Sequence, residues 1–131
     1  YAVSRPEIVT YLNRMRPTFE ANSVALLFGE ALLRRPDIIK ALIQTEKEGR
    51  LYLMEALTRA GYGPRHDHGG NFVLVKPEKC PREVEAALKE RKILVKTYGD
   101  KHLLRDYIRI STGSRRAMEK FVAAFLDIDQ R

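Results

Sequence analysis

Asp106-Tyr107-Ile108-Arg109-Ile110-Ser111-Thr112-Gly113-Ser114 is the stretch from which the fold of this chain can be inferred. Successive side chains of a β-strand point to opposite faces, so a strand over residues 107–111 places Ile108 and Ile110 on one face and Arg109 on the other. The last serine of the stretch is the predicted N-cap of a final helix. Apolar residues recur in that helix at positions i, i+3, i+4 and i+7, namely Met118, Phe121, Val122 and Phe125. We therefore expect the two isoleucines to pack against helices of the same domain.

Two more strands are predicted upstream of this stretch. They are Phe72–Val75 and Ile93–Lys96, and glycines and prolines between residues 61 and 70 separate them from the helical first half of the chain. A helix from Pro81 to about Arg91 is predicted between the two strands. The predicted order is βαββα, which is an α+β fold (an α/β sandwich) with a sheet of about three strands backed by the helices after Pro81 and Ser114.

Three helices are predicted before the sheet. They span residues 6–16, residues 24 to about 33, and residues 36 to about 60. The third is the longest, and Gly49 is its weak point because glycine inside a helix costs about 1 kcal/mol relative to alanine. We therefore divide the chain into a helical segment, residues 1–35, and a small domain, residues 36–131, which contains the long linking helix.

The charge of the chain raises the question of nucleic-acid binding. The 131 residues include 24 Lys and Arg against 17 Asp and Glu, a formal net charge of +7. The basic residues occur in short groups interleaved with acidic ones, which indicates a solvated or partner-facing surface more than a phosphate-binding patch. A small basic α+β module that binds RNA is the rival interpretation. It would require an aromatic pair on a sheet face with a glycine-bearing basic motif, which the sequence lacks.

Other features indicate a part of a longer soluble protein. The chain begins with Tyr1 and has no basic-then-apolar leader, so we expect it to be a piece of a longer chain. The longest apolar runs, such as residues 121–126, are far shorter than the roughly 20 residues that cross a bilayer, so we expect no membrane partner. Cys80 is the single cysteine, which fits a reducing cytosol and excludes an internal disulfide.

Several motifs together resemble one enzyme family. The stretch Asp106–Ser114 looks like the strand-turn-helix signature near the end of fold-type-I, pyridoxal-phosphate-dependent aminotransferases. Asn71–Val75 and Ile93–Lys96 resemble the two preceding strands of the histidinol-phosphate aminotransferases. Tyr1-Ala-Val3 and Arg16–Ser23 are similar to the segment that follows the phosphate-binding arginine of that family. The resemblance covers essentially all of the chain.

This resemblance implies a function for the parent protein. The related enzymes transfer an amino group between glutamate and imidazole-acetol phosphate in histidine biosynthesis, as cytoplasmic homodimers that hold pyridoxal 5'-phosphate on a lysine. That lysine and the phosphate-binding arginine would lie before Tyr1, so residues 1–35 would be a remnant of the large cofactor-binding domain. The resemblance therefore implies no catalytic or cofactor-binding residue in this chain, which we expect to be inactive alone and to bind no cofactor. An amino-acid-phosphate decarboxylase of the same fold is the alternative.

Arg109 is the residue that we expect to bind substrate. Its guanidinium carries a fork of donors that matches a carboxylate or a phosphate. The competing interpretation from the sequence is a structural salt bridge on an exposed sheet face, and the family motif favours the substrate role. Asn22 is a second candidate, because the resemblance places it in a loop that approaches the active site. Asn22 is also a predicted helix N-cap, and the two roles are compatible.

A metal site is not expected. His66, Asp67 and His68 are close together, with His102 elsewhere, but alternate residues of a glycine-flanked loop do not fix two imidazoles around one ion. We interpret this segment as a polar turn before a strand. The relatives usually have a plainer turn there, so the exact member of the family stays open. Cys80 is interpreted as a helix-start residue.

Overall fold

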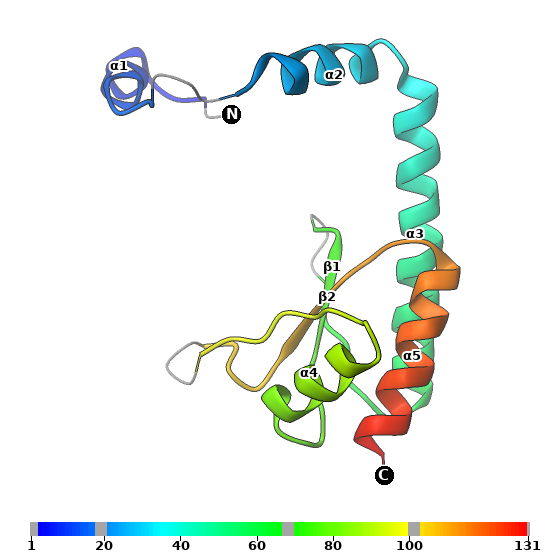
Figure 1. Cartoon of the computed structure of the whole chain (residues 1–131). Helices are drawn as coiled ribbons and strands as arrows, with labels where there is room; N and C mark the ends of the chain where they lie inside the picture. Colours follow the sequence, from blue (N-terminus) through cyan, green and yellow to red (C-terminus); the bar gives the residue numbers. More distant parts are fainter. Residues whose placement is uncertain (1–2, 18–20, 67–69, 100–102, 131) are drawn as a thin grey trace. The chain divides into compact units, whose positions relative to one another are not determined.

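The computed structural model describes residues 3–17, 21–66, 70–99 and 103–130. Its contacts divide the chain into two compact units, residues 1–39 and residues 40–131. The helix α3, Pro36–Arg59, begins in the first unit and continues through the second. Figure 1 shows the elements of both units. The predicted boundary between residues 35 and 36 remains a prediction, because a division by contacts is not a test of domain boundaries.

The first unit is helical, as predicted. It contains α1, Pro6–Arg14, and α2, Ser23–Leu33. Proline begins α1, where its missing N–H has no intrahelical partner to lose. Neither helix has a buried residue. Apolar side chains of α2 are therefore exposed, including Val24, Leu26, Leu27, Phe28 and Leu33.

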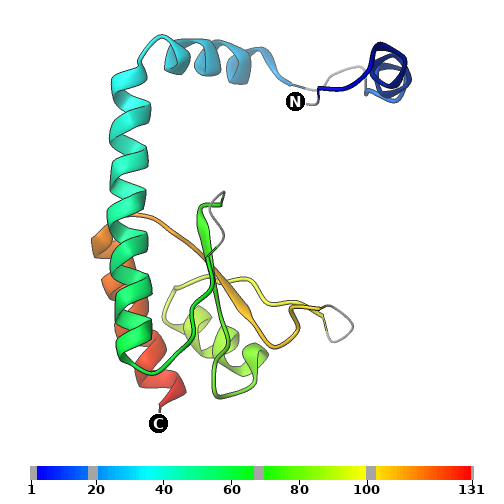
Figure 2. The same ribbon diagram turned by 180° about the vertical axis from the view of Figure 1, so that it is seen from behind.

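The second unit is built on two antiparallel strands. They are β1, Phe72–Val75, and β2, Ile108–Ser111, with Val73 opposite Ile110 and Val75 opposite Ile108. The helix α4, Pro81–Glu90, lies between the strands in the sequence, and α5, Arg115–Asp129, follows β2. Figures 1 and 2 show from opposite sides that α5 runs alongside the second part of α3. The predicted helices and the predicted strands 72–75 and 107–111 are confirmed to within one or two residues, which is normal at element ends.

The prediction of a third strand over Ile93–Lys96 was wrong. Of residues 93–96, all of which the structure describes, only Lys96 forms a β-type pairing, which is an isolated bridge to Arg109. The segment leaves α4 at Lys92, whose φ is +61°, and the Ile93 N–H caps that helix by donating to the Leu88 carbonyl oxygen. Pairing with β2 therefore starts only at Lys96. A second isolated bridge, Arg65 to Leu74, flanks β1 on its other side.

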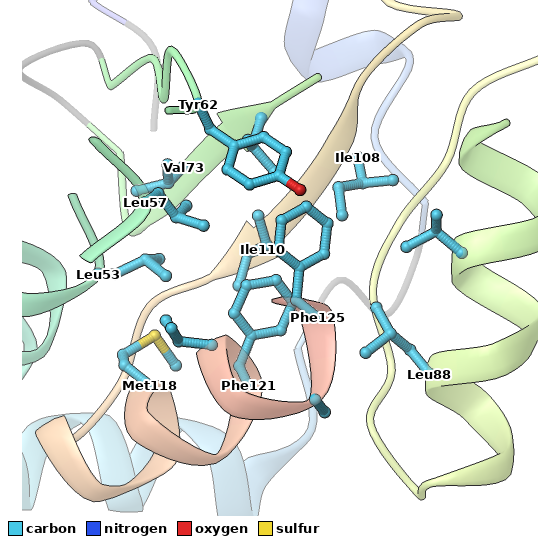
Figure 3. Close-up of a cluster of buried hydrophobic side chains, with 14 residues drawn as sticks. Leu53, Leu57, Tyr62, Val73, Leu88, Ile108, Ile110, Met118, Phe121 and Phe125 are labelled. Atoms are coloured by element: carbon cyan, nitrogen blue, oxygen red, sulfur yellow. The ribbon is translucent and has the colours of Figure 1, made fainter. Parts of the chain in front are cut away.

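The hydrophobic core of this unit lies between the sheet and its helices. Figure 3 shows Leu53 and Leu57 of α3 meeting Phe121 and Phe125 of α5. The two phenylalanine rings stack with their centroids 5.5 Å apart. From the sheet, the core receives Val73, Val75, Ile108 and Ile110, each at most 3% exposed. The predicted packing of Ile108 and Ile110 against the helices is confirmed.

At Gly49, α3 lies close against the turn between β2 and α5. It is buried, and a Cβ atom built on it would lie 1.9 Å from the carbonyl oxygen of Gly113. Real Cβ atoms do not approach backbone oxygens to such a distance, so a side chain at this position requires a shift of the backbone. Glycine at position 49 lowers the intrinsic helix propensity of α3, but the close packing of α3 against Gly113 requires it.

A buried carboxylate fastens the end of α5 to two other segments. Asp129 is 4% exposed, and its oxygens accept hydrogen bonds from the Tyr62 hydroxyl at 2.6 Å and from the Glu78 and Lys79 backbone N–H groups at 2.9 and 3.0 Å. Burial and the adjacent Asp129 carboxylate raise the pKa of the Tyr62 phenol. Three donors thus satisfy a polar group that would be costly to bury alone.

Tyr62→Phe should lower the free energy of unfolding by about 1.5 kcal/mol at neutral pH, because a hydrogen bond to a charged group is lost while two donors remain on the carboxylate. The raised pKa of Tyr62 gives this contribution a pH dependence. It is complete below the ordinary phenol pKa of about 10, and it is lost as the pH rises further, because the unfolded tyrosine ionises first. Urea denaturation at pH 7 and pH 10.5 measures both effects. Tyr52→Phe, in the same unit, is the control, and an equal loss in both variants would contradict the prediction.

Candidate functional site

The face of the sheet opposite the core carries polar and aromatic side chains. Arg109 of β2 lies on this face, and its guanidinium carbon is 5.2 Å from the centroid of the Phe72 ring. Stacking on an aromatic face orients the guanidinium and leaves its in-plane N–H donors available. The Arg109 Nε is buried and has no hydrogen-bond partner among the described residues. Arg109 is thus held by stacking, with a donor still unsatisfied.

The strand register brings a second cation next to Arg109. Arg109 and Lys96 exchange two backbone hydrogen bonds, of 2.8 and 3.0 Å. Residues paired directly across antiparallel segments point to the same face of the sheet, about 5.5 Å apart at Cα. Lys96 is exposed, so its ammonium group can reach an anion bound at the Arg109 guanidinium. The sequence did not identify Lys96 as a candidate site residue, because a strand register cannot be derived from two short apolar runs.

Arg65 is linked to Arg109 by strand pairing, but its side chain contacts a different aromatic ring. It pairs with Leu74, which pairs with Arg109. The Arg65 guanidinium carbon is 5.5 Å from the centroid of the Tyr107 ring, just before β2 begins. The Phe72 ring, on which Arg109 stacks, lies at the other end of β2, because Phe72 is paired with Ser111. Residues 107 and 111 are roughly 13 Å apart along a strand. The two arginines therefore do not converge on one small anion, and the pair that can do so is Arg109 and Lys96.

The charge on this face is not neutralised by the protein in the regions that the structure describes. No ion pair forms in these regions to Arg65, Lys96 or Arg109, while several other arginines and lysines do form ion pairs. The structural salt bridge that competes with the substrate role of Arg109 is thus absent from the described residues. An unneutralised pair of cations beside an aromatic ring favours a carboxylate or phosphate ligand.

A cleft of about 390 Å³ lies between α3 and the segment before β1, and it is lined by Leu42, Ile43, Glu46, Arg50, His66, Gly70 and Asn71. Glu46 is half-buried in this cleft and accepts hydrogen bonds from the Thr112 hydroxyl at 2.7 Å and from Arg50 Nε at 3.0 Å. Burial by itself would raise the pKa of Glu46, but these hydrogen bonds and the Arg50 charge hold that pKa below its ordinary value. Glu46 is therefore ionised at neutral pH.

Another cavity, of about 400 Å³, lies elsewhere on the second unit. Its lining comes from α4 and the segment after it, namely Arg82, Glu85, Ala86, Lys89, Ile93, Leu94 and Val95. Neither Arg109 nor Lys96 lines it. Since cavity size alone does not identify a site, we base the assignment on the chemistry of the sheet face.

The structure gives mixed outcomes for the other predicted site residues. The Asn22 side chain accepts a hydrogen bond from the Ala25 N–H at 2.8 Å, so its role as N-cap of α2 is confirmed, and its substrate-binding role stays a prediction.

His66 Nδ1 lies 3.1 Å from the Phe72 carbonyl oxygen, while Asp67, His68 and His102 lie outside the described residues. Within residues 3–17, 21–66, 70–99 and 103–130, no group of three His, Cys, Asp or Glu side chains could hold a metal ion. Cys80 is exposed and precedes α4 without a side-chain cap, as expected.

No protein-family model matches the chain. It is 31% identical over 132 residues to the histidinol-phosphate aminotransferase of Oleidesulfovibrio alaskensis and 32% identical over 124 residues to that of Symbiobacterium thermophilum. These alignments cover 98% and 95% of this chain but 34% of each relative. The same enzyme of Geotalea daltonii is 28% identical over 127 residues, which are 97% of this chain and 36% of that protein. The chain thus spans about a third of the length of the curated relatives it matches.

Solved structures show the same relationship. A protein of Burkholderia pseudomallei K96243 that is assigned as an aminotransferase superposes with a TM-score of 0.75 and 28% identity, over 92% of this chain and 37% of that one. A protein of Erwinia carotovora atroseptica that is assigned as a histidinol-phosphate aminotransferase has a TM-score of 0.58 at 16% identity, over 66% of this chain and 24% of that one, and supports the fold alone. The resemblance to aminotransferases and the α+β fold, both predicted from the sequence, are confirmed. None of the described helices combines the length and the apolar composition that a membrane span requires.

Proposed function

We propose that this chain is the carboxy-terminal part of a pyridoxal-phosphate-dependent aminotransferase of the histidinol-phosphate type, in which Arg109 binds the anionic group of the substrate. The single observation that carries the proposal is the Arg109 guanidinium, stacked on Phe72 with an unpartnered donor on an unneutralised sheet face. The sequence similarity to named histidinol-phosphate aminotransferases supports the reaction class.

In this proposal Arg109 holds the α-carboxylate of glutamate, or the phosphate of imidazole-acetol phosphate in the same place. A guanidinium matches either group with two parallel N–H donors. Lys96, beside it in register, adds a second charge that does not depend on the orientation of the anion. The contribution of these residues to the reaction is to orient the substrate, since neither is required to transfer a proton.

The residues described here do not fit covalent attachment of the cofactor. All the described lysines are exposed side chains: Lys40, Lys47, Lys76, Lys79, Lys89, Lys92, Lys96 and Lys120. A lysine that forms a covalent link to a cofactor at neutral pH is usually desolvated or beside another cation, because its amine must lose a proton. We therefore assign pyridoxal phosphate and its lysine to the remainder of the parent protein, and residues 1–35 to its large domain. The parent is proposed to be a cytoplasmic homodimer, with Asn22 as a second substrate contact.

An amino-acid-phosphate decarboxylase of the same fold is the alternative, because such an enzyme also binds an anionic amino compound. The experiment that separates the two uses full-length protein loaded with pyridoxal phosphate. We expect glutamate to be converted to 2-oxoglutarate with imidazole-acetol phosphate as acceptor, without release of carbon dioxide from an amino-acid phosphate. Carbon dioxide release in place of amino transfer would support the decarboxylase.

The same assay includes the present chain alone. We expect no amino transfer, and no cofactor retained on a lysine after borohydride reduction, because the described lysines are exposed and lack a phosphate cradle. Mass spectrometry of the reduced chain checks this. A stoichiometric label on a single lysine of the chain would contradict the assignment of the cofactor site to the remainder of the protein.

A further inference from the structure

Glu46 connects α3 to the ends of both strands. Its Oε1 accepts from the Thr112 hydroxyl, and the Thr112 N–H donates to the Asn71 carbonyl oxygen at 2.8 Å. Thr112 follows the last residue of β2, and Asn71 precedes the first residue of β1. One hydrogen bond thus links the Glu46 carboxylate to Thr112 at the end of β2, and a second links Thr112 to Asn71 at the start of β1.

The hydrogen bond between Glu46 and Thr112 is partly shielded from water and involves a charged acceptor. The Glu46 side chain is 24% exposed and receives a second hydrogen bond from Arg50, whose side chain is 22% exposed. Hydrogen bonds to an ionised acceptor are roughly twice as strong as neutral ones, and partial burial protects them from screening by salt. By contrast, the other glutamate–arginine pair of α3 at the same spacing, Glu55 and Arg59, is 65% and 80% exposed.

The turn that Glu46 holds is also in backbone contact with α3. Gly49, one turn further along the helix, lies against Gly113, the residue after Thr112. The end of β2 is therefore fixed to α3 at two points, by a charged hydrogen bond and by close packing. Both contacts lie within four residues of Arg109.

These contacts lie close to the residues that support the Arg109 side chain. Its side chain has no ion pair in the described regions, and its support is the Phe72 ring. Phe72 follows Asn71, and Arg109 precedes Thr112 by three residues, so both members of the stacked pair lie on strand ends that Glu46 holds. A shift of either end against α3 would move the guanidinium relative to a bound anion.

We propose that Glu46 is a positioning residue for substrate binding, which acts through Thr112 and Asn71 on Arg109. This inference rests on the proposed function of Arg109 and adds a residue that does not touch the substrate. Misplacement of a binding group by about 1 Å is enough to reduce catalytic efficiency strongly. The effect should be on the binding of the anionic substrate more than on the rate of the bound complex.

The experiment is a double-mutant cycle in the full-length enzyme, with glutamate as the varied substrate. Glu46→Ala should lower kcat/KM about tenfold, mainly through KM, and Glu46→Gln should recover part of this because the amide oxygen still accepts from Thr112. In an Arg109→Ala background the further loss from Glu46→Ala should be about twofold or less, because the group that Glu46 positions is already absent. Glu55→Ala is the matched control on the same helix and should leave kcat/KM unchanged.

The outcomes separate the two hypotheses. If Arg109→Ala alone has no effect on kcat/KM, the proposed function of Arg109 fails. Two results would refute the positioning role of Glu46 when Arg109→Ala itself has a large effect. In the first, Glu46→Ala lowers kcat/KM by the same factor with and without Arg109. In the second, Glu46→Ala leaves kcat/KM unchanged in both backgrounds. If Glu46→Ala does not fold, Thr112→Val removes the donor of the same hydrogen bond with little change in side-chain shape. The double-mutant cycle is then measured with Thr112→Val and Arg109→Ala.

Discussion

Arg109→Ala in the full-length enzyme should lower kcat/KM for glutamate by roughly 30- to 1000-fold, which corresponds to about 2–4 kcal/mol of lost transition-state stabilisation. The physical reason is the loss of two charge-assisted hydrogen bonds in a partly desolvated place. The Arg109 guanidinium already lies stacked on Phe72, so an anion would find its terminal N–H donors oriented in advance.

The measurement is steady-state kinetics, with the occupancy of pyridoxal phosphate determined separately from absorbance. Cofactor occupancy should be nearly unchanged, because Arg109 is assigned to the substrate. Arg109→Lys should recover only part of the activity, since an ammonium group cannot reproduce the planar fork. Arg59→Ala removes the same charge from the exposed end of α3 and is the control. Wild-type kcat/KM in the alanine variant would refute the assignment of Arg109 as substrate anchor.

Gly49→Ala should destabilise the chain by about 2–3 kcal/mol, although alanine is the better helix former by about 1 kcal/mol. The added Cβ would lie 1.9 Å from the Gly113 carbonyl oxygen, and neither backbone can move away without disturbing the core below. Thermal unfolding followed by circular dichroism should show a Tm lower by about 10 °C or more.

Gly29→Ala is the matched control for this substitution. Gly29 is also inside a helix, α2, but a Cβ atom there would have no neighbour within 4 Å. This variant should therefore be neutral or slightly stabilising, as helix propensity alone predicts. Equal effects of the two substitutions would show that the contact between α3 and the Gly113 turn is not tight in solution.

Features of this chain that depend on neighbouring residues could be predicted from the sequence. The caps Asn22 and Ser114 each bond to the N–H three residues ahead, as the local pattern requires. The alternation around Arg109 assigned the faces of β2 correctly, because side-chain direction in a strand depends only on parity. The apolar period of α5 likewise identified the side chains that enter the core.

Features that join distant residues could not be predicted. Glu46 and Thr112 are 66 positions apart, and Tyr62 and Asp129 are 67 apart, so no local period relates them. Lys96 became a candidate site residue only through its pairing with Arg109, and pairing register is fixed by tertiary packing. The failed third strand has the same origin, since an apolar run predicts burial but does not specify which backbone groups find partners.

The exposed helices α1 and α2 have a calorimetric consequence. The heat capacity of unfolding is determined mainly by the apolar surface that becomes hydrated, and these two helices bury no residue in the folded chain. Melting the unit of residues 1–39 by itself would hydrate little new apolar surface, so the heat-capacity change that arises from packing inside the two units should come almost entirely from residues 40–131. An ordinary 131-residue protein would show about 1.7 kcal/mol/K, whereas packing inside the two units of this chain should give nearer to about 1.2 kcal/mol/K. The curve of its stability against temperature should therefore be flatter than its length suggests.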